Sequence, residues 1–194
     1  PKGTPEEVTE TFQEFWDSAE LIRVLVARPE SWAENFTSTL AGMLKPRERL
    51  SLPGVAAHVV WLGGDATMTT CGTIEWGTKQ FCRFEVRPYT QRLADMAGTE
   101  DPEIIIAIAE LACAVVYVAT KTESGEWHQK LIIYVGDNTN VKSWIRKRTA
   151  RNRMARHLLR VLRYVELKGR FKLVALWLRT YHNYSLDWLS REEE

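Results

Sequence analysis

Four carboxylates stand out by their positions in the chain. Asp65 follows the apolar run VVWLGG and Asp137 follows LIIYVG, so each lies at the end of an expected strand. Glu110 is the one charged residue in the apolar stretch IIIAIAELACAVVYVA, and Asp187 lies in YHNYSLDWLSRE near the end of the chain. A carboxylate isolated among apolar side chains is costly unless it takes up a proton or meets a cation. If these residues converge, they form an all-oxygen site of the kind that suits Mg²⁺ or Mn²⁺.

The chemistry expected of such a site is phosphodiester hydrolysis. Two divalent ions about 3.5–4 Å apart, held by shared carboxylates, activate a water molecule and stabilise the leaving oxygen. A simpler interpretation stays open for the two aspartates that follow strands, because Gly-Gly-Asp and Gly-Asp-Asn are also common turn sequences.

A strongly basic segment could supply the contacts to a phosphate-bearing substrate. Between Lys142 and Lys172 the chain has twelve Lys or Arg residues and one acid, Glu166, whereas the rest has fourteen bases and twenty-four acids. A solvated helix face is the ordinary explanation of such a run, and a surface for a polyanion is the other. The candidate nucleic-acid-binding residues are Asn138, Asn140, Arg146, Lys147, Arg148, Arg151 and Arg153, of which the two asparagines could equally cap a turn.

Hydrophobic periodicity predicts the elements that must position these residues. Residues 55–67, 69–77 and 79–89 predict three successive antiparallel strands, 102–120 a long apolar helix and 130–137 a fourth strand. Helices over 138–148 and 150–168, a fifth strand over 170–179 and a last helix over 186–194 complete the order βββαβααβα. Gly169 is the expected C-cap before the fifth strand. Trp61 and Trp144 are expected in the core.

Composition favours one main globular domain with a small appendage. The chain has 194 residues, of which 45% are hydrophobic and 26% charged, an ordinary balance for a globular protein. Residues 4–44 predict helix with a break at Pro29, and the polar stretch KPRERLSLPG predicts a boundary between a helical segment, 1–54, and the main domain, 55–194.

The cysteines and the apolar stretch bear on location. Three cysteines without CxxC spacing argue against a disulfide framework or a zinc site, and they favour an intracellular location, cytoplasmic or nuclear. The 16-residue apolar stretch is short for a membrane span and holds a charge. The sequence begins PKGTPEE, without an initiator Met and without a secretory leader, so we expect a piece of a longer polypeptide and no membrane.

Four stretches resemble the ribonuclease H domains of retroelement (retrotransposon) reverse transcriptases of the gypsy and DIRS types. They are VVWLGGDAT, ELACAVVYV, VGDNTNVKSWI and HNYSLDWLSRE. The last is the most specific, since those domains typically end in an Asn, an Asp and Leu-Ser-Arg, for which this chain has Asn183, Asp187 and the sequence LSR. The resemblance covers roughly residues 55–192.

The resemblance implies an α/β fold of the ribonuclease H type. In it, three antiparallel strands and then two parallel strands form a mixed sheet flanked by helices, and the helical segment 1–54 connects the nuclease to the polymerase part of the same polyprotein. The implied activity is an endonuclease that hydrolyses the RNA strand of RNA/DNA hybrids with two Mg²⁺ or Mn²⁺ ions. The catalytic and metal-binding residues carried over are Asp65, Glu110, Asp137 and Asp187, and His182 lies near the place of a mobile histidine found in many members.

Two alternatives to this activity stay open. One is a catalytically inactive domain of the same fold that serves in nucleic-acid binding or assembly. The other is an integrase or transposase nuclease that acts on DNA.

Overall fold

The structure is a computed structural model of the chain, and the residues that it describes are 13, 15–20, 22–23, 27 and 58–177. The chain divides into two compact units, Pro1–Thr37 and Ser38–Glu194, and each is considered by itself. In the first unit, residues 13, 15–20 and 22–23 are helical. The expected domain boundary at residue 54, His182, Asp187 and the expected last helix lie outside the described residues.

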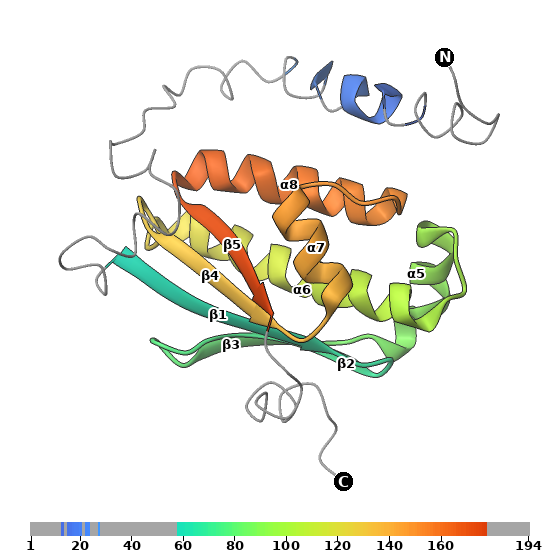
Figure 1. Cartoon of the computed structure of the whole chain (residues 1–194), viewed down its shortest axis with the longest axis horizontal. Coiled ribbons are helices and arrows are strands. Elements are labelled where there is room, and N and C mark those ends of the chain that lie inside the picture. Colours follow the sequence, from blue (N-terminus) through green and yellow to red (C-terminus); the bar gives the residue numbers. More distant parts are fainter. Residues whose placement is uncertain (1–12, 14, 21, 24–26, 28–57, 178–194) are drawn as a thin grey trace, which may run out of the picture. The chain divides into compact units, whose positions relative to one another are not determined.

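A five-stranded mixed sheet organises the second unit (Figure 1). β1 (Val59–Ala66), β2 (Thr70–Glu75) and β3 (Gln80–Glu85) pair in antiparallel fashion. β4 (Leu131–Gly136) runs parallel to β1, and β5 (Lys172–Trp177) runs parallel to β4. The strand order is β3-β2-β1-β4-β5. The predicted α/β class, with three antiparallel strands followed by two parallel ones and flanking helices, is therefore confirmed.

Three of the helices follow their predicted ranges. They are α6 (Pro102–Ser124), α7 (Thr139–Lys147) and α8 (Arg153–Gly169). Each begins after a capping side chain, because Asp101, Asn138 and Asn152 accept hydrogen bonds from backbone N–H groups of the first turns. The expected C-cap at Gly169 is wrong: α8 runs through Gly169, and Arg170 takes the left-handed conformation after it.

A short helix before α6 is absent from the sequence prediction. The 3₁₀ turn η2 (Arg87–Tyr89) and α5 (Thr90–Ala97) follow β3. Ala94 and Ala97 are the only buried residues of α5. Two alanines give little hydrophobic periodicity, which explains why the sequence pattern did not predict the helix.

The main core lies between one face of the sheet and the helices. α6 packs across β1, β2 and β3, and α8 packs on α6 (Figure 1). Leu62, Ile132 and Tyr134 of the central strands belong to this core, together with the expected Trp144. Because side chains alternate along a strand, the neighbouring residues Leu131, Ile133 and Val135 form a separate apolar cluster on the opposite face.

The two central strands differ in how fully they are buried. Every residue of β4 is buried, as expected for a strand covered on both faces. Trp61 in β1 is 45% exposed, so its expected place in the core is wrong. The face of the sheet on which Trp61 lies is thus only partly covered.

α6 is long and apolar enough to cross a membrane by length and composition. Twelve of its 23 residues are buried within the unit. The same apolar surface is therefore used for packing against the sheet and α8 in this structure.

A polar network fixes the C-terminal half of α6 to β2 and β3. Lys121, only 5% exposed, has its Nζ 2.6 Å from Glu126 Oε2, 2.5 Å from Gln80 Oε1 and 3.3 Å from Glu75 Oε2. The Tyr117 hydroxyl donates to the same Glu75 oxygen at 3.2 Å. The network joins α6 to β2 and β3, and it thereby helps to fix the position of α6 on the sheet, including that of Glu110.

The three cysteines gather between β2, β3 and α6. Cys82 Sγ and Cys113 Sγ are 3.5 Å apart, and all three thiols are free. Hydrogen bonding to Cys71 and Cys82, together with burial, raises the pKa of the Cys113 thiol. The cysteines are far apart in the sequence, so the sequence did not predict this cluster. Cys113 lies about one helical turn after Glu110 on α6.

Candidate active site

Glu110 lies at the centre of the candidate site. It is on α6, only 1% of its surface is exposed, and its Oε1 accepts a 2.7 Å hydrogen bond from the hydroxyl of Tyr134. Tyr134 belongs to β4 and is equally buried. The carboxyl group in the middle of the apolar helix therefore faces the sheet, where the hydroxyl of Tyr134 on β4 binds it.

Two glycines make room for this pair. A Cβ atom on Gly64 of β1 would overlap the Tyr134 hydroxyl, and one on Gly136 of β4 would lie 2.9 Å from Glu110 Oε1. A side chain at either position would therefore displace the buried hydrogen bond. Both glycines lie within strands, as the predicted ranges 55–67 and 130–137 placed them, and not in the turns that the Gly-Gly-Asp and Gly-Asp-Asn sequences also allowed.

Asp65 and Asp137 come to the same end of the sheet as neighbours. β1 and β4 are parallel, with Gly63 paired to Val135; Asp65 lies two residues further along β1, and Asp137 follows directly after the last residue of β4. Both aspartates are half-buried. The carboxyl ends of parallel strands are where ligands commonly bind in such sheets, and α7 begins directly after this point.

The electrostatics link all three carboxylates. Burial is the largest cause that raises the pKa of Glu110 well above its ordinary value, and the negative charges of Asp65 and Asp137 raise it further. The hydrogen bonds from Tyr134 and Asn138 oppose this shift by stabilising the ionised form. In the absence of a cation, the site therefore favours a protonated Glu110.

The donor chemistry fits a hard divalent cation. Asp65, Glu110 and Asp137 offer only oxygen atoms, and mutual repulsion among carboxylates is relieved when a cation binds between them. In residues 58–177 and the described part of the first unit, no group of three or more His, Cys, Asp or Glu side chains is already arranged to hold a metal ion. Asp187, the fourth ligand implied by the resemblance, lies outside the described residues together with His182.

The predicted nucleic-acid-binding residues fall into three groups. Asn138 caps α7, since its Oδ1 accepts from the N–H groups of Asn140 and Val141 at 3.0 and 3.3 Å. Arg146 and Lys147 are exposed in the last turn of α7, Arg151 is exposed between α7 and α8, and Arg153 is exposed at the first position of α8. Arg148 forms the third group and points inward.

Arg148 is held by a buried acid. Its Nη2 donates to Glu166 Oε1 and to the Leu173 carbonyl, both at 2.6 Å, and its Nη1 donates to the Ile145 carbonyl at 2.9 Å. Glu166 Oε1 also accepts from the Leu173 N–H at 2.7 Å. This arrangement joins α7, α8 and β5, so the structure gives Arg148 a role in the fold.

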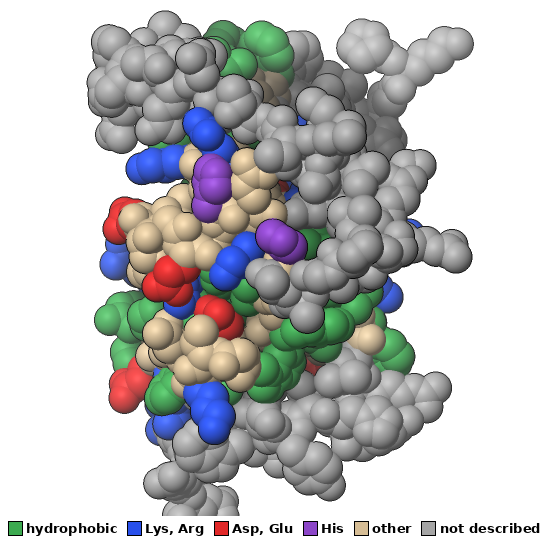
Figure 2. Space-filling view, turned by 90° about the vertical axis from the view of Figure 1, so that its left-hand side faces the viewer, with side chains coloured by type: hydrophobic (Ala, Val, Ile, Leu, Met, Phe, Trp, Pro, Cys, Tyr) green, Lys and Arg blue, Asp and Glu red, His purple; other side chains and the backbone are tan. Residues whose placement is uncertain are grey.

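The opposite end of the unit has a different surface. The amino ends of β1 and β4 lie on the left in Figure 1 and face the viewer in Figure 2. Acidic, basic and histidine side chains are interspersed across the described part of that face (Figure 2). Asp65 and Asp137 lie at the other end, where β1 and β4 finish and α7 begins.

No protein-family model matches the chain, and no curated protein matches it. The residues of the site and the sequence resemblance are therefore what point to a function for this chain.

Proposed function

We propose that this chain is a metal-dependent endonuclease of the ribonuclease H type that hydrolyses the RNA strand of RNA/DNA hybrids. The observation that carries the proposal is the meeting of Asp65 from β1, Glu110 from α6 and Asp137 from the end of β4 at one end of the sheet. The strand order β3-β2-β1-β4-β5 agrees with the fold that the sequence resemblance implies. Three elements that are distant in the sequence thus contribute one carboxylate each.

The chain's own residues hold and orient the reacting groups. Asp65, Glu110 and Asp137, with Asp187, are the proposed ligands of two Mg²⁺ or Mn²⁺ ions. When bound, such ions activate a water molecule and stabilise the leaving oxygen of the phosphodiester. Tyr134 positions the Glu110 carboxylate through the 2.7 Å hydrogen bond, and Gly64 and Gly136 keep the space around it clear.

The exposed basic residues at the end of α7 and the start of α8 suit a polyanionic substrate. Arg146 and Lys147 in α7, Arg151 before α8 and Arg153 at the start of α8 are all exposed, and exposed cations of this kind contact phosphates. By the resemblance, the same polyprotein would carry the polymerase that makes the hybrid, and the location would be intracellular. In this proposal, residues 1–54 connect the two activities.

A cleavage assay tests the proposal. The full chain is incubated with a hybrid labelled on its RNA strand, with Mg²⁺ or with a chelator, beside single-stranded RNA and duplex DNA. We expect metal-dependent cleavage of the hybrid RNA alone, lost in Asp65→Asn and Asp137→Asn. Glu123→Gln, which removes an exposed carboxylate from α6, is the matched control and should cleave normally. Cleavage of duplex DNA instead of the hybrid would favour the integrase or transposase alternative.

A second candidate function has one observation in its favour. Glu110 is buried and bound to Tyr134, which is also how a structural carboxyl group would be placed. A catalytically inactive domain that binds nucleic acid would keep this pair without cleaving. Salt-sensitive binding of the hybrid with no metal-dependent cleavage by the unaltered chain would support this candidate and reject the nuclease.

A further inference from the structure

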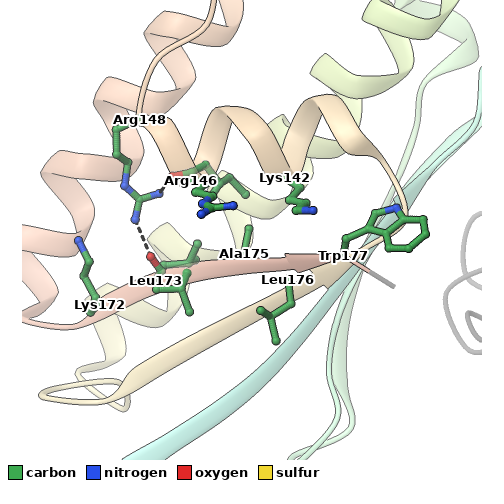
Figure 3. Close-up of a pocket in the computed structure, with 10 residues that line it drawn as sticks. Lys142, Arg146, Arg148, Lys172, Leu173, Ala175, Leu176 and Trp177 are labelled. Atoms are coloured by element: carbon green, nitrogen blue, oxygen red, sulfur yellow. Dashed lines mark hydrogen bonds between the residues drawn. The ribbon is translucent and has the colours of Figure 1, made fainter. Parts of the chain in front are cut away.

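A pocket of about 620 Å³ opens between α7 and β5 (Figure 3). Its cationic lining consists of Lys142, Arg146, Arg148 and Lys172, and Trp177 lies at the end where β5 stops. Among the described residues that line it, none is acidic. A volume of this size is typical of sites for small molecules or for a short piece of a polymer.

The four cations are not equivalent. Arg148 forms an ion pair with Glu166 at 2.6 Å, so its charge is already neutralised and it contributes only to the wall of the pocket. For Lys142 and Arg146, the described part of the chain provides no carboxylate partner. They lie four residues apart on α7, which places them on one face of the helix about 6 Å apart along its axis. The pocket therefore presents positive charge that an anion could neutralise.

Trp177 provides a fixed aromatic surface beside this charge. Its Nε1 donates to the backbone carbonyl of Asp137 at 2.9 Å, and the residue remains 43% exposed. Lys142 Nζ lies 6.0 Å from the ring centroid. An aromatic ring held in place next to cations is the arrangement that binds single-stranded nucleic acid, because a base stacks on the ring while the cations contact the backbone.

We propose that this pocket binds an unpaired strand of nucleic acid, with phosphates contacting Lys142, Arg146 and Lys172 and one base stacked on Trp177. The inference rests on the proposed function in taking the polymer to be nucleic acid. Trp177 is hydrogen-bonded to Asp137, so a strand in the pocket would continue from a hybrid held at the carboxylates. Paired bases cannot stack on a side chain in the middle of a duplex, and the ring therefore selects an unpaired end.

Equilibrium binding tests the pocket without cleavage. The full chain carrying Asp65→Asn is titrated in EDTA into a fluorescein-labelled ten-nucleotide oligothymidylate, and anisotropy is followed at several salt concentrations. We expect Trp177→Leu to weaken binding about tenfold and Trp177→Phe to retain most of it. Lys142→Ala should lower the slope of log affinity against log salt by about 0.7, the value for one lost phosphate contact on a single strand.

Lys79→Ala is the control for the loss of one positive charge. Lys79→Ala removes one exposed charge from the turn between β2 and β3, beside the opposite edge of the sheet, and should bind as the parent does. An equal loss in Lys79→Ala and Lys142→Ala, or no loss in Trp177→Leu, would overturn the proposal. Competition by a polyglutamate peptide as effective as that by unlabelled oligonucleotide would reassign the pocket to acidic peptides.

The same preparation separates this proposal from the nuclease. Oligothymidylate binding that depends on Trp177, in a chain that fails to cleave a blunt hybrid with Mg²⁺, would reject the proposed activity and keep the pocket. Cleavage of the blunt hybrid without Trp177-dependent binding would support the proposed activity and reject the pocket as a binding site.

Discussion

The hydroxyl of Tyr134 donates a 2.7 Å hydrogen bond to Oε1 of Glu110, and both residues are buried between β4 and α6. Removing the hydroxyl leaves a buried acceptor without this donor, which generally costs about 1–3 kcal/mol. We expect Tyr134→Phe to lower the free energy of unfolding by that amount in urea melts. In a double-mutant cycle with Glu110→Gln, the two effects should not add, whereas additive effects would mean that the two side chains do not interact.

Glu110→Gln should separate catalysis from stability. Changes to residues that merely orient a metal ligand typically cost 10–100-fold in metal affinity or activity, so loss of the ligand itself should reduce hybrid cleavage by about 100-fold or more. Glu123→Gln is the control on the same helix. Unimpaired cleavage by Glu110→Gln would remove Glu110 from the site.

The same variant has a defined pH dependence of stability. The pKa of Glu110 is raised in the folded state, first by burial and then by Asp65 and Asp137. A group of this kind contributes stability that is fully present below its unfolded pKa, about 4.3, and is lost as the pH rises through the folded pKa. Glutamine does not ionise, so Glu110→Gln should be more stable than the parent at pH 7 and equal to it near pH 4. Unfolding of the variant at pH 7 would show that the carboxylate itself is needed for the fold.

Gly136→Ala tests whether the space beside Glu110 is required. The new Cβ would lie 2.9 Å from Glu110 Oε1 and 3.3 Å from the Gly64 carbonyl oxygen, and crowding of a packed interior typically costs about 1–3 kcal/mol. We expect a loss of stability in that range together with reduced cleavage. Gly77→Ala is the matched control, because a Cβ there meets nothing within 4 Å. Equal behaviour of the two variants would contradict the packing argument.

The sequence was sufficient to predict the strands that the structure describes and to select three carboxylates as candidates for the site. A charge that interrupts or ends an apolar run is a local feature, and Asp65, Glu110 and Asp137 could be selected from it directly. Their meeting at one end of the sheet then depends on the parallel pairing of β1 with β4. That pairing agrees with the order of elements along the chain.

The partners of these residues could not be predicted in the same way. Tyr134 is 24 residues from Glu110 in the sequence, and its position in a predicted strand does not indicate that the two side chains meet. The predicted strands include Gly64 and Gly136, but nothing in the sequence shows that these two glycines leave space for the pair. The sequence does not distinguish Arg148 from the other bases of the basic segment, although its guanidinium is bound to Glu166, 18 residues away. Such contacts depend on how helices pack on the sheet, and neither periodicity nor charge counts carry that information.

The network around Lys121 predicts a large effect on stability. Lys121 and Glu75 are both buried, and the Lys121 ammonium is 3.3 Å from the Glu75 carboxylate. Lys121→Met removes the cation and leaves Glu75 as an uncompensated buried charge, a change that generally costs about 3–5 kcal/mol. Thermal or urea unfolding should register this loss, whereas the exposed Lys79→Met should have little effect. A stability of Lys121→Met close to that of the parent would mean that Glu75 takes up a proton at little cost.

Arg146 and Arg148, two residues apart in the chain, should respond in opposite ways to the same substitution. Arg148 is paired with the buried Glu166 at 2.6 Å and also binds the Leu173 carbonyl, so Arg148→Met should lower the free energy of unfolding by about 3–5 kcal/mol. At a temperature where the variant remains folded, its affinity for the hybrid and the salt dependence of that affinity should match those of the parent. Arg146 is exposed in the last turn of α7, so Arg146→Met should leave stability within about 0.5 kcal/mol of the parent and lower the salt slope by about 0.9, the value for one phosphate contact on a duplex. Urea melts measure the free energy of unfolding of the two variants, and hybrid titrations at several salt concentrations measure their salt slopes. A lower salt slope in Arg148→Met at unchanged stability would return Arg148 to the nucleic-acid surface that the sequence predicts.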